Sequence, residues 1–260
     1  MSKLSTKVRR EIVRGLNDFN MIEEGDRIMV ACSGGKDSTI LLLLLEEIRK
    51  KSPITFSLFP VMLDQKQPGF NAIAYTAWLK EQGVELDIIS EDTYSIVQEK
   101  TPEGKAFCGV CSRLRRGILY NYAEAQDFTK IALGHHRDDM NQTLLMNLFF
   151  AGKIAGMPAK LRSDDHRNIL IRPMVYVAEE HIIELAKDYA FPIMPCNLCG
   201  TQENLQRQEM KNLLFKMEAK HPDIGAVMQN AMSNIRPSQL ADQDLWSFDD
   251  FEHLQKVVSH

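Results

Sequence analysis

The chain contains, at residues 27–38, the stretch Arg27-Ile28-Met29-Val30-Ala31-Cys32-Ser33-Gly34-Gly35-Lys36-Asp37-Ser38, and a second apolar run, Ile40 to Leu45, follows it. The first six residues form a short apolar, β-prone run. The second run, together with residues 46–51, is long enough for a helix, and the two glycines allow the tight turn between them. The sequence therefore predicts a strand that leads directly into the N-terminus of a helix.

A strand-to-helix turn of this kind is suited to a nucleotide phosphate. Unpaired backbone N–H groups and the positive end of the helix dipole point out of a helix N-terminus together. Lys36 adds a cation and Ser38 a hydroxyl. The stretch is not the common P-loop, since Val30 and Asp37 stand where that pattern needs Gly and Ser or Thr. The alternative is a Gly-rich turn that binds nothing.

Length and composition are those of a soluble globular protein. With 260 residues, 44% of them hydrophobic and 25% charged, the chain can form one α/β domain with an addition, or two modest domains. The longest apolar run is too short to span a bilayer and no stretch resembles a signal peptide, so we expect a cytoplasmic protein without a membrane partner. A formal net charge of −4 leaves any nucleic-acid binding to local basic patches.

Two basic patches are present. The first is N-terminal, and the second lies beside a pair of cysteines; their members are Lys3, Lys7, Arg9, Arg10 and Arg14, and Lys105, Arg113, Arg115 and Arg116. For each, the alternative is an ordinary solvated helix face.

Strand and helix patterns alternate along the first three quarters of the chain. They predict an α/β fold with an open, mainly parallel twisted sheet and helices on both faces. Expected strands cover 27–32, 55–63, 85–89, 130–133 and 168–171, and expected helices 7–20, 40–51, 71–81, 112–125, 139–150, 178–189, 203–220 and 223–233. Residues 91–107 are expected to be a polar excursion. We divide the chain into an N-terminal helix (1–24), a catalytic domain (25–195) and a helical C-terminal extension with an acidic tail (196–260).

Four of the five cysteines form two pairs with metal-ligand spacing, Cys108 with Cys111 and Cys196 with Cys199. In a cytosolic chain a structural disulfide is improbable. Spacing alone leaves three interpretations open: a structural zinc held by four thiolates, an iron-sulfur cluster held by three cysteines with one open iron, and a redox pair. Cys32, inside the first strand, is expected to be a buried and inert thiol.

Five separated motifs resemble, in order, those of the tRNA 2-thiocytidine biosynthesis (TtcA) family, which belongs to the PP-loop ATP pyrophosphatases. They are Ser33 to Ser38, Leu63 to Phe70, Cys108 to Arg116, Gly134 to Asp139 and Pro195 to Gly200. The resemblance covers most of the chain and weakens in the tail after Pro237-Ser238.

The resemblance implies an ATP-dependent sulfurtransferase that converts cytidine 32 of tRNA to 2-thiocytidine, using Mg²⁺ and a 4Fe-4S cluster. The implied cluster ligands are Cys108, Cys111 and Cys199, which leaves the role of Cys196 open. The family further implies the anticodon loop of tRNA as substrate, a cysteine desulfurase as sulfur source, and a homodimer. Arg113, Arg115 and Arg116 follow the first cysteine pair, and we expect them to hold tRNA phosphates.

For the nucleotide, the resemblance assigns the loop Ser33, Gly34, Gly35, Lys36, Asp37 and Ser38, and we add Asp64 at the end of the second strand. Lys36 and Asp37 are expected to take part in catalysis, and Asp138 to bind Mg²⁺ or to act on the cytosine as acid or base. Helix N-capping is the alternative role of Asp138 and Asp139. We assign no catalytic role to His135 or His136.

We expect the cytosine 2-oxygen to attack the α-phosphorus of ATP, after which sulfide replaces the adenylated oxygen and AMP leaves. Other enzymes with the same loop are the nearest alternatives: a 2-thiouridine synthetase, a lysidine synthetase or a phosphoadenylylsulfate reductase. Lysidine synthesis leaves the cysteine pairs unexplained, and the reductases depend on a C-terminal cysteine that is missing after Cys199. A non-catalytic ATP-binding module with a structural zinc is the alternative from another class.

Overall fold

The computed structural model describes residues 2–100, 108–192, 194 and 202–248. Its centre is a six-stranded sheet with the order β3-β2-β1-β4-β6-β5. The strands are β1 (Arg27–Cys32), β2 (Ser57–Asp64), β3 (Asp87–Ser90), β4 (Lys130–Ala132), β5 (Lys160–Arg162) and β6 (Ile169–Ile171). All neighbouring strands run parallel except β5, which pairs antiparallel with β6 at the edge. The predicted α/β class is confirmed.

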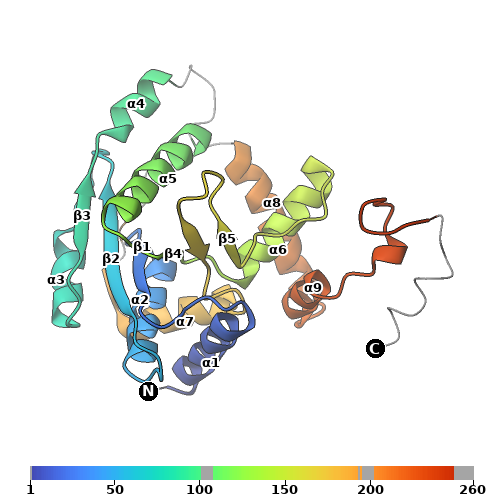
Figure 1. The fold of residues 1–260 in the computed structure, drawn as a ribbon, viewed down its shortest axis with the longest axis horizontal. Coiled ribbons are helices and arrows are strands. Elements are labelled where there is room, and N and C mark those ends of the chain that lie inside the picture. Colours follow the sequence, from blue (N-terminus) through green and yellow to red (C-terminus); the bar gives the residue numbers. More distant parts are fainter. Residues whose placement is uncertain (1, 101–107, 193, 195–201, 249–260) are drawn as a thin grey trace.

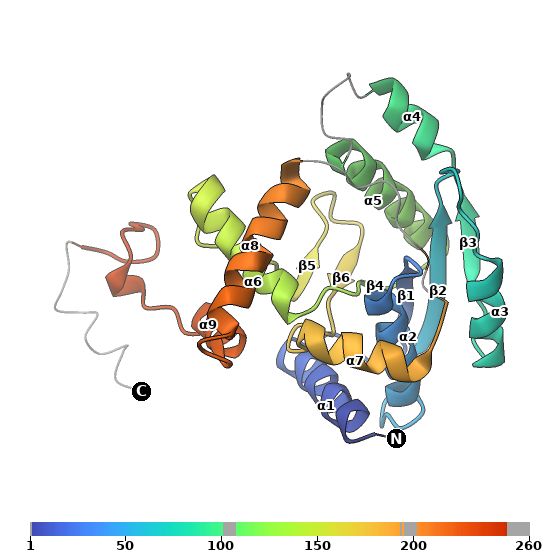
Figure 2. The same cartoon turned by 180° about the vertical axis from the view of Figure 1, so that it is seen from behind.

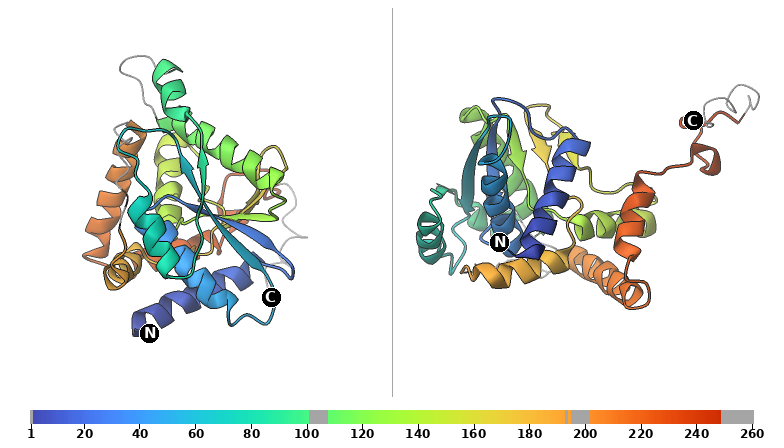
Figure 3. Two further views of the ribbon diagram at one scale, coloured as in Figure 1. Left: turned by 90° about the vertical axis from the view of Figure 1, so that its left-hand side faces the viewer. Right: turned by 90° about the horizontal axis from the view of Figure 1, so that it is seen from below.

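Helices cover both faces of this sheet. The α-helices of the described residues are α1 (Lys3–Asp18), α2 (Lys36–Arg49), α3 (Ile73–Glu81), α4 (Thr93–Lys100), α5 (Cys108–Ala125), α6 (Arg137–Met146), α7 (Glu179–Tyr189), α8 (Gln202–Glu218) and α9 (Ile224–Met232). Buried side chains of α1, α2, α3 and α7 share one core with the sheet, and α5 packs on the other face (Figures 1 and 3). Helices α8 and α9 pack on α6, beside the sheet rather than on it (Figure 2).

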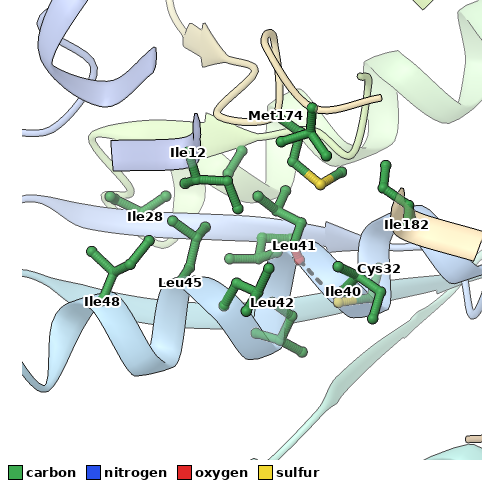
Figure 4. Close-up of a cluster of buried hydrophobic side chains, with 14 of the residues drawn as sticks. Ile12, Ile28, Cys32, Ile40, Leu41, Leu42, Leu45, Ile48, Met174 and Ile182 are labelled. Atoms are coloured by element: carbon green, nitrogen blue, oxygen red, sulfur yellow. Dashed lines mark hydrogen bonds between the residues drawn. The ribbon is translucent and has the colours of Figure 1, made fainter. Parts of the chain in front are cut away.

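The alternation along β1 explains how the sheet is covered twice. Ile28 and Val30 point to the larger core, whereas Met29 points to the α5 side. Behind β1, the helix α2 has buried residues on every side, which is why its sequence is a continuous apolar run rather than an amphipathic stripe. Figure 4 shows Leu41 and Leu45 of this helix among Ile12, Met174 and other apolar side chains. The strand and helix that flank residues 33–35 are therefore rigidly packed.

The structure differs from expectation in three places. Residues 91–107 contain a helix, α4, where a polar excursion was expected; Asp92 accepts a hydrogen bond from the backbone N–H of Ser95 (3.0 Å) and so caps its first turn. The edge strand β5 was missed because it is three residues long and two of them are charged. The expected helix over 139–150 ends at Met146 and continues as a π-helix over Asn147–Ala151. Among the described helices, none is both long and apolar enough to cross a membrane.

Candidate active site

The loop between β1 and α2 is held by hydrogen bonds among its own residues. The Ser38 hydroxyl accepts a hydrogen bond from the Ser33 backbone N–H (3.1 Å) and lies 3.1 Å from the Ser33 hydroxyl. Gly35 is the N-cap residue of α2 and has no side chain that could satisfy the first N–H groups of the helix. The predicted strand, turn and helix N-terminus are confirmed, and the helix begins at Lys36.

Two glycines bring the backbone close to other segments at this loop. Gly34 has a φ of +75°, and a Cβ added to it would lie 2.7 Å from the sulfur of Met194. Gly134 follows the fourth strand, and a Cβ there would lie 2.9 Å from the backbone nitrogen of Ser38. The segment Gly134 to Asp139 therefore lies directly against the first turn of α2, as expected for loops at the carboxyl ends of neighbouring parallel strands.

Lys36 lies within a small charge network that links three helices. Its ammonium is 3.1 Å from a carboxylate oxygen of Asp37 and 3.1 Å from Glu179 at the start of α7. Glu179 in turn accepts from Lys211 of α8 at 2.7 Å. Burial lowers the pKa of Lys36, but the two carboxylates outweigh it and the pKa is raised overall. Lys36 therefore remains a cation at neutral pH.

His136 lies inside a group of carboxylates. Its ring nitrogens are 3.4 Å from Asp139, 3.6 Å from Asp138 and 3.8 Å from Asp37, and the side chain is only 5% exposed. Burial lowers the pKa of His136, but these carboxylates outweigh it and the pKa is raised overall. The ring of His136 thus lies between Asp37 of one loop and Asp138 and Asp139 of the other.

A cavity of about 710 Å³ extends from the loop to α5. One end is lined by loop residues, including Ser33, Asp37 and Ser38, and by Gly134. Four arginines also line the cavity: Arg115 and Arg116 at the end formed by α5, Arg172, which follows β6, and Arg207 of α8. Among described residues, the cavity thus combines a phosphate-binding loop with a basic wall. Its volume is that of a ligand site for a drug-sized molecule.

Of the predicted cluster ligands, Cys111 lies near this cavity. It lies in the first turn of α5 and is half-buried. Its thiol donates a hydrogen bond to the side-chain oxygen of Gln65 (3.3 Å), and Gln65 lines the cavity. The helix α5 begins at Cys108, four residues earlier than expected, and that side chain lies outside the described residues, as do Cys196 and Cys199. Cys32 is buried as expected, and burial raises the pKa of its thiol to about 12.

The two predicted carboxylates outside the loop occupy less open positions. Asp64 ends β2. Its carboxylate accepts a hydrogen bond from the backbone N–H of Lys66 (2.8 Å) and forms an ion pair with the ammonium of Lys66 (3.2 Å). Asp138 accepts from the backbone N–H of Glu179 at 2.8 Å, so it caps α7 rather than its own helix. Burial raises the pKa of Asp138, but His136 and Arg137 outweigh this and the pKa is lowered overall. Their roles toward the nucleotide stay predictions.

Several residues of the site were not predicted. Glu179 was visible only as an acidic residue at the start of an expected helix, and Arg172 and Arg207 carried no local signal at all. Gln65 belonged to a quoted motif but had no assigned role. Each of these residues reaches the site from a chain segment more than 30 residues away from its partner there.

Comparison with known proteins identifies the family. A model of the PP-loop domain matches residues 4–214. A tRNA-cytidine(32) 2-sulfurtransferase of Bdellovibrio bacteriovorus is 55% identical over 245 residues, which are 94% of each chain. The chain belongs to the tRNA-cytidine(32) 2-sulfurtransferases, within the PP-loop proteins. The member from Erwinia tasmaniensis is 52% identical over 258 residues, which cover 99% of this chain and 84% of that protein.

A solved structure gives the same fold. The U34-tRNA thiolase NcsA of Methanococcus maripaludis, determined with its [4Fe-4S] cluster, aligns with a TM-score of 0.71 and 21% sequence identity. The alignment covers 89% of this chain and 79% of that one. This likeness confirms the mainly parallel PP-loop fold, and membership of the family makes the chain an enzyme.

Proposed function

We propose that the protein is an ATP-dependent sulfurtransferase that adenylates the C2 oxygen of cytidine 32 in tRNA and replaces it with sulfur. The observation that carries the proposal is the shared cavity. It is lined by the PP-loop at one end and by the arginines of α5 at the other, with Cys111 one helical turn from those arginines. A nucleotide and a nucleic-acid base bound in one cavity can react directly with each other.

The residues of the loop fit the phosphates of ATP. The N–H groups at the start of α2 have no side-chain cap, and Lys36 supplies a half-buried cation beside them. A phosphate that reaches Lys36 competes with Glu179 for it, and Lys211 then still neutralises Glu179. Asp138, with Asp37 nearby, is the proposed place for Mg²⁺, which would offset the charge of the phosphates when bound.

In the first step, the C2 oxygen of cytosine attacks the α-phosphorus of ATP, and the bond to the β-phosphate oxygen breaks. Negative charge grows on the departing pyrophosphate. Fixed N–H donors of the loop and Lys36 stabilise that charge because they are already oriented before reaction. The product is a base whose C2 oxygen carries AMP, a far better leaving group than oxide.

On the tRNA side, Arg115 and Arg116 would hold phosphates of the anticodon loop, and the target base would leave its stack to enter the cavity. Cys108, Cys111 and Cys199 are the proposed ligands of a 4Fe-4S cluster, and the half-buried thiol of Cys111 at the cavity edge fits that role. When bound, such a cluster would supply sulfide from its one iron without a protein ligand.

In the second step, sulfide attacks C2 and the bond from C2 to oxygen breaks, so that AMP leaves with the original oxygen. The arginine wall favours the departing anion. A cysteine desulfurase is the proposed source of sulfur, and a homodimer the proposed assembly. The same chemistry on another nucleotide would make the protein a 2-thiouridine synthetase.

Nucleoside analysis of tRNA tests this proposal. Anaerobically purified, cluster-loaded protein is incubated with unmodified tRNA, ATP, Mg²⁺ and sulfide, and the digested tRNA is analysed by mass spectrometry. The proposal expects 2-thiocytidine at position 32, with one AMP and one pyrophosphate per sulfur inserted. Formation of 2-thiouridine or lysidine, or a protein that carries zinc and no iron, would contradict it.

A further inference from the structure

His135 faces the same cavity as the loop, and one of its ring nitrogens is already engaged. The Nε–H of Arg172 donates a hydrogen bond to Nδ1 of His135 at 3.3 Å. A guanidinium has only donors and stays protonated in proteins, so Nδ1 must be the acceptor and carry no proton. The ring is therefore a neutral imidazole with its proton on Nε2.

Arg172 is well fixed to impose this state. Its side chain is buried, with 8% exposure, and a second donor of the guanidinium, Nη1, bonds to the carbonyl oxygen of Pro158 at 2.6 Å. The pKa of His135 agrees with the geometry: burial lowers it to about 4, with Asp139 acting in the opposite direction. The charged or titratable groups that act on the pKa of the ring or line the same cavity are Asp37, Asp139, His136, Arg172, Arg207, Arg115, Arg116, Tyr120 and Cys32.

The second nitrogen, Nε2, has no hydrogen-bond partner among the described residues, and His135 lines the cavity. The position of His135 along the chain places it beside the N-terminus of α2. His135 directly follows Gly134, whose Cα lies against the backbone of Ser38 in the first turn of α2. Phosphate oxygens of a nucleotide bound as proposed would lie at that helix N-terminus.

We propose that the Nε2–H of neutral His135 donates a hydrogen bond to a phosphate oxygen of the bound nucleotide, and that Arg172 is the positioning residue that fixes this tautomer. The assignment rests on the proposed binding of ATP at this loop. His135 then acts as a fixed donor and not as an acid or base, because it holds the same single proton throughout the neutral pH range.

The tautomer is testable without turnover. In protein labelled with ¹⁵N-histidine, long-range ¹H–¹⁵N spectra should show His135 with Nε2 protonated and Nδ1 bare, unchanged from pH 5.5 to 8.5. Binding of α,β-methylene-ATP should shift the Nε2 proton. In Arg172→Met the donor to Nδ1 is lost, so a form with the proton on Nδ1 should become detectable, whereas Arg172→Lys, which keeps a donor, should preserve the bare Nδ1. A native His135 protonated on Nδ1, or one that titrates near 6.5, would overturn the proposal.

Affinity for the nucleotide provides the second readout. A Gln amide can place its N–H where Nε2 stood, whereas Asn reaches only the Nδ1 position. Hydrogen bonds to charged groups contribute on the order of 1.5–3 kcal/mol, so His135→Ala and His135→Asn should weaken α,β-methylene-ATP binding about 10-fold or more, and His135→Gln about 3-fold or less. His221→Gln, remote from the cavity, is the control.

Equal losses in all three His135 variants, or none, would refute the donor role. These measurements need neither tRNA nor sulfur. Absence of 2-thiocytidine in the assay above would therefore contradict the proposed function without contradicting the role of His135. Equal nucleotide affinities in the three His135 variants would contradict the role of His135 without contradicting the proposed function.

Discussion

The two ends of the cavity differ in charge and in how they are held. At the loop end, Asp37 and Asp139 are tied to Lys36 and His136, and hydrogen bonds between Ser33 and Ser38 fix the backbone before any ligand arrives. At the α5 end the cavity is lined by Arg115 and Arg116, and among the described residues neither arginine forms an ion pair with a carboxylate. This difference fits the proposed ligands, which are Mg²⁺ and the phosphates of ATP at the loop end and tRNA at the arginine end.

The largest expected effect concerns the arginine end, where Cys111 lies. Replacing Cys111 with Ala should remove a cluster ligand and reduce 2-thiocytidine formation about 100-fold or more, because the site for sulfide is lost with the cluster. Binding of α,β-methylene-ATP should stay within about 2-fold, since the loop is untouched. Nucleoside analysis and iron and sulfide assays measure the two effects.

Cys32→Ala is the matched control for that variant. Its thiol is buried in the core and its raised pKa keeps it protonated, so iron content should be unchanged. Full iron content in Cys111→Ala would show that the cluster is held elsewhere.

The next effect falls on the loop end. Lys36→Ala should slow pyrophosphate release about 100-fold, as expected when one oriented donor to the developing charge is removed. Affinity for tRNA should hardly change. Lys187→Ala, an exposed lysine on α7, serves as control, and coupled detection of pyrophosphate is the measurement. Equal rates for the two variants would remove Lys36 from the mechanism.

A smaller effect separates the two basic patches of the chain. Charge reversal of Arg115 and Arg116 should weaken tRNA binding and make it less sensitive to salt, with the slope of log K against log[salt] reduced by about 1–2. Reversal of Lys7 and Arg10 on α1 changes the same net charge away from the cavity and should leave both quantities close to wild type. If the α1 variant has the larger effect, tRNA lies on the other side of the molecule.

The smallest effect is a pH dependence of stability. The pKa of His135 is about 4 in the folded protein, so its neutral form contributes fully above the ordinary value of 6.5. As pH falls from 6.5 toward 4, the unfolded chain gains this proton first and stability is lost, by about 2 kcal/mol at pH 5. His135→Gln cannot titrate, so its urea unfolding free energy should fall less steeply over this range. Parallel curves for the two proteins would contradict the buried neutral ring.

Much of the fold followed from local pattern. The apolar run of β1, the Gly-Gly turn and the uniformly apolar α2 are consecutive in the chain, so their physics is visible in the sequence. The capped helix α4 was hidden in a polar stretch, and the edge strand β5 depends on pairing with β6 rather than on its own three residues.

The site was predictable to the same extent. Residues of the loop were found because they adjoin one turn. In contrast, Glu179 meets Lys36 across 143 positions, and the Arg172 contact that sets the tautomer of His135 spans 37. Such contacts are determined by tertiary packing, so no local sequence pattern predicts them.

Direct adenylation of the base is the central claim, and the fate of one oxygen tests it most directly. tRNA that carries ¹⁸O at C2 of cytidine 32 is thiolated with ATP and sulfide, and the released AMP is analysed by mass spectrometry. The account predicts one ¹⁸O in the phosphate of AMP for each 2-thiocytidine formed. AMP without the label, alongside full thiolation, would contradict attack of the C2 oxygen on the α-phosphorus.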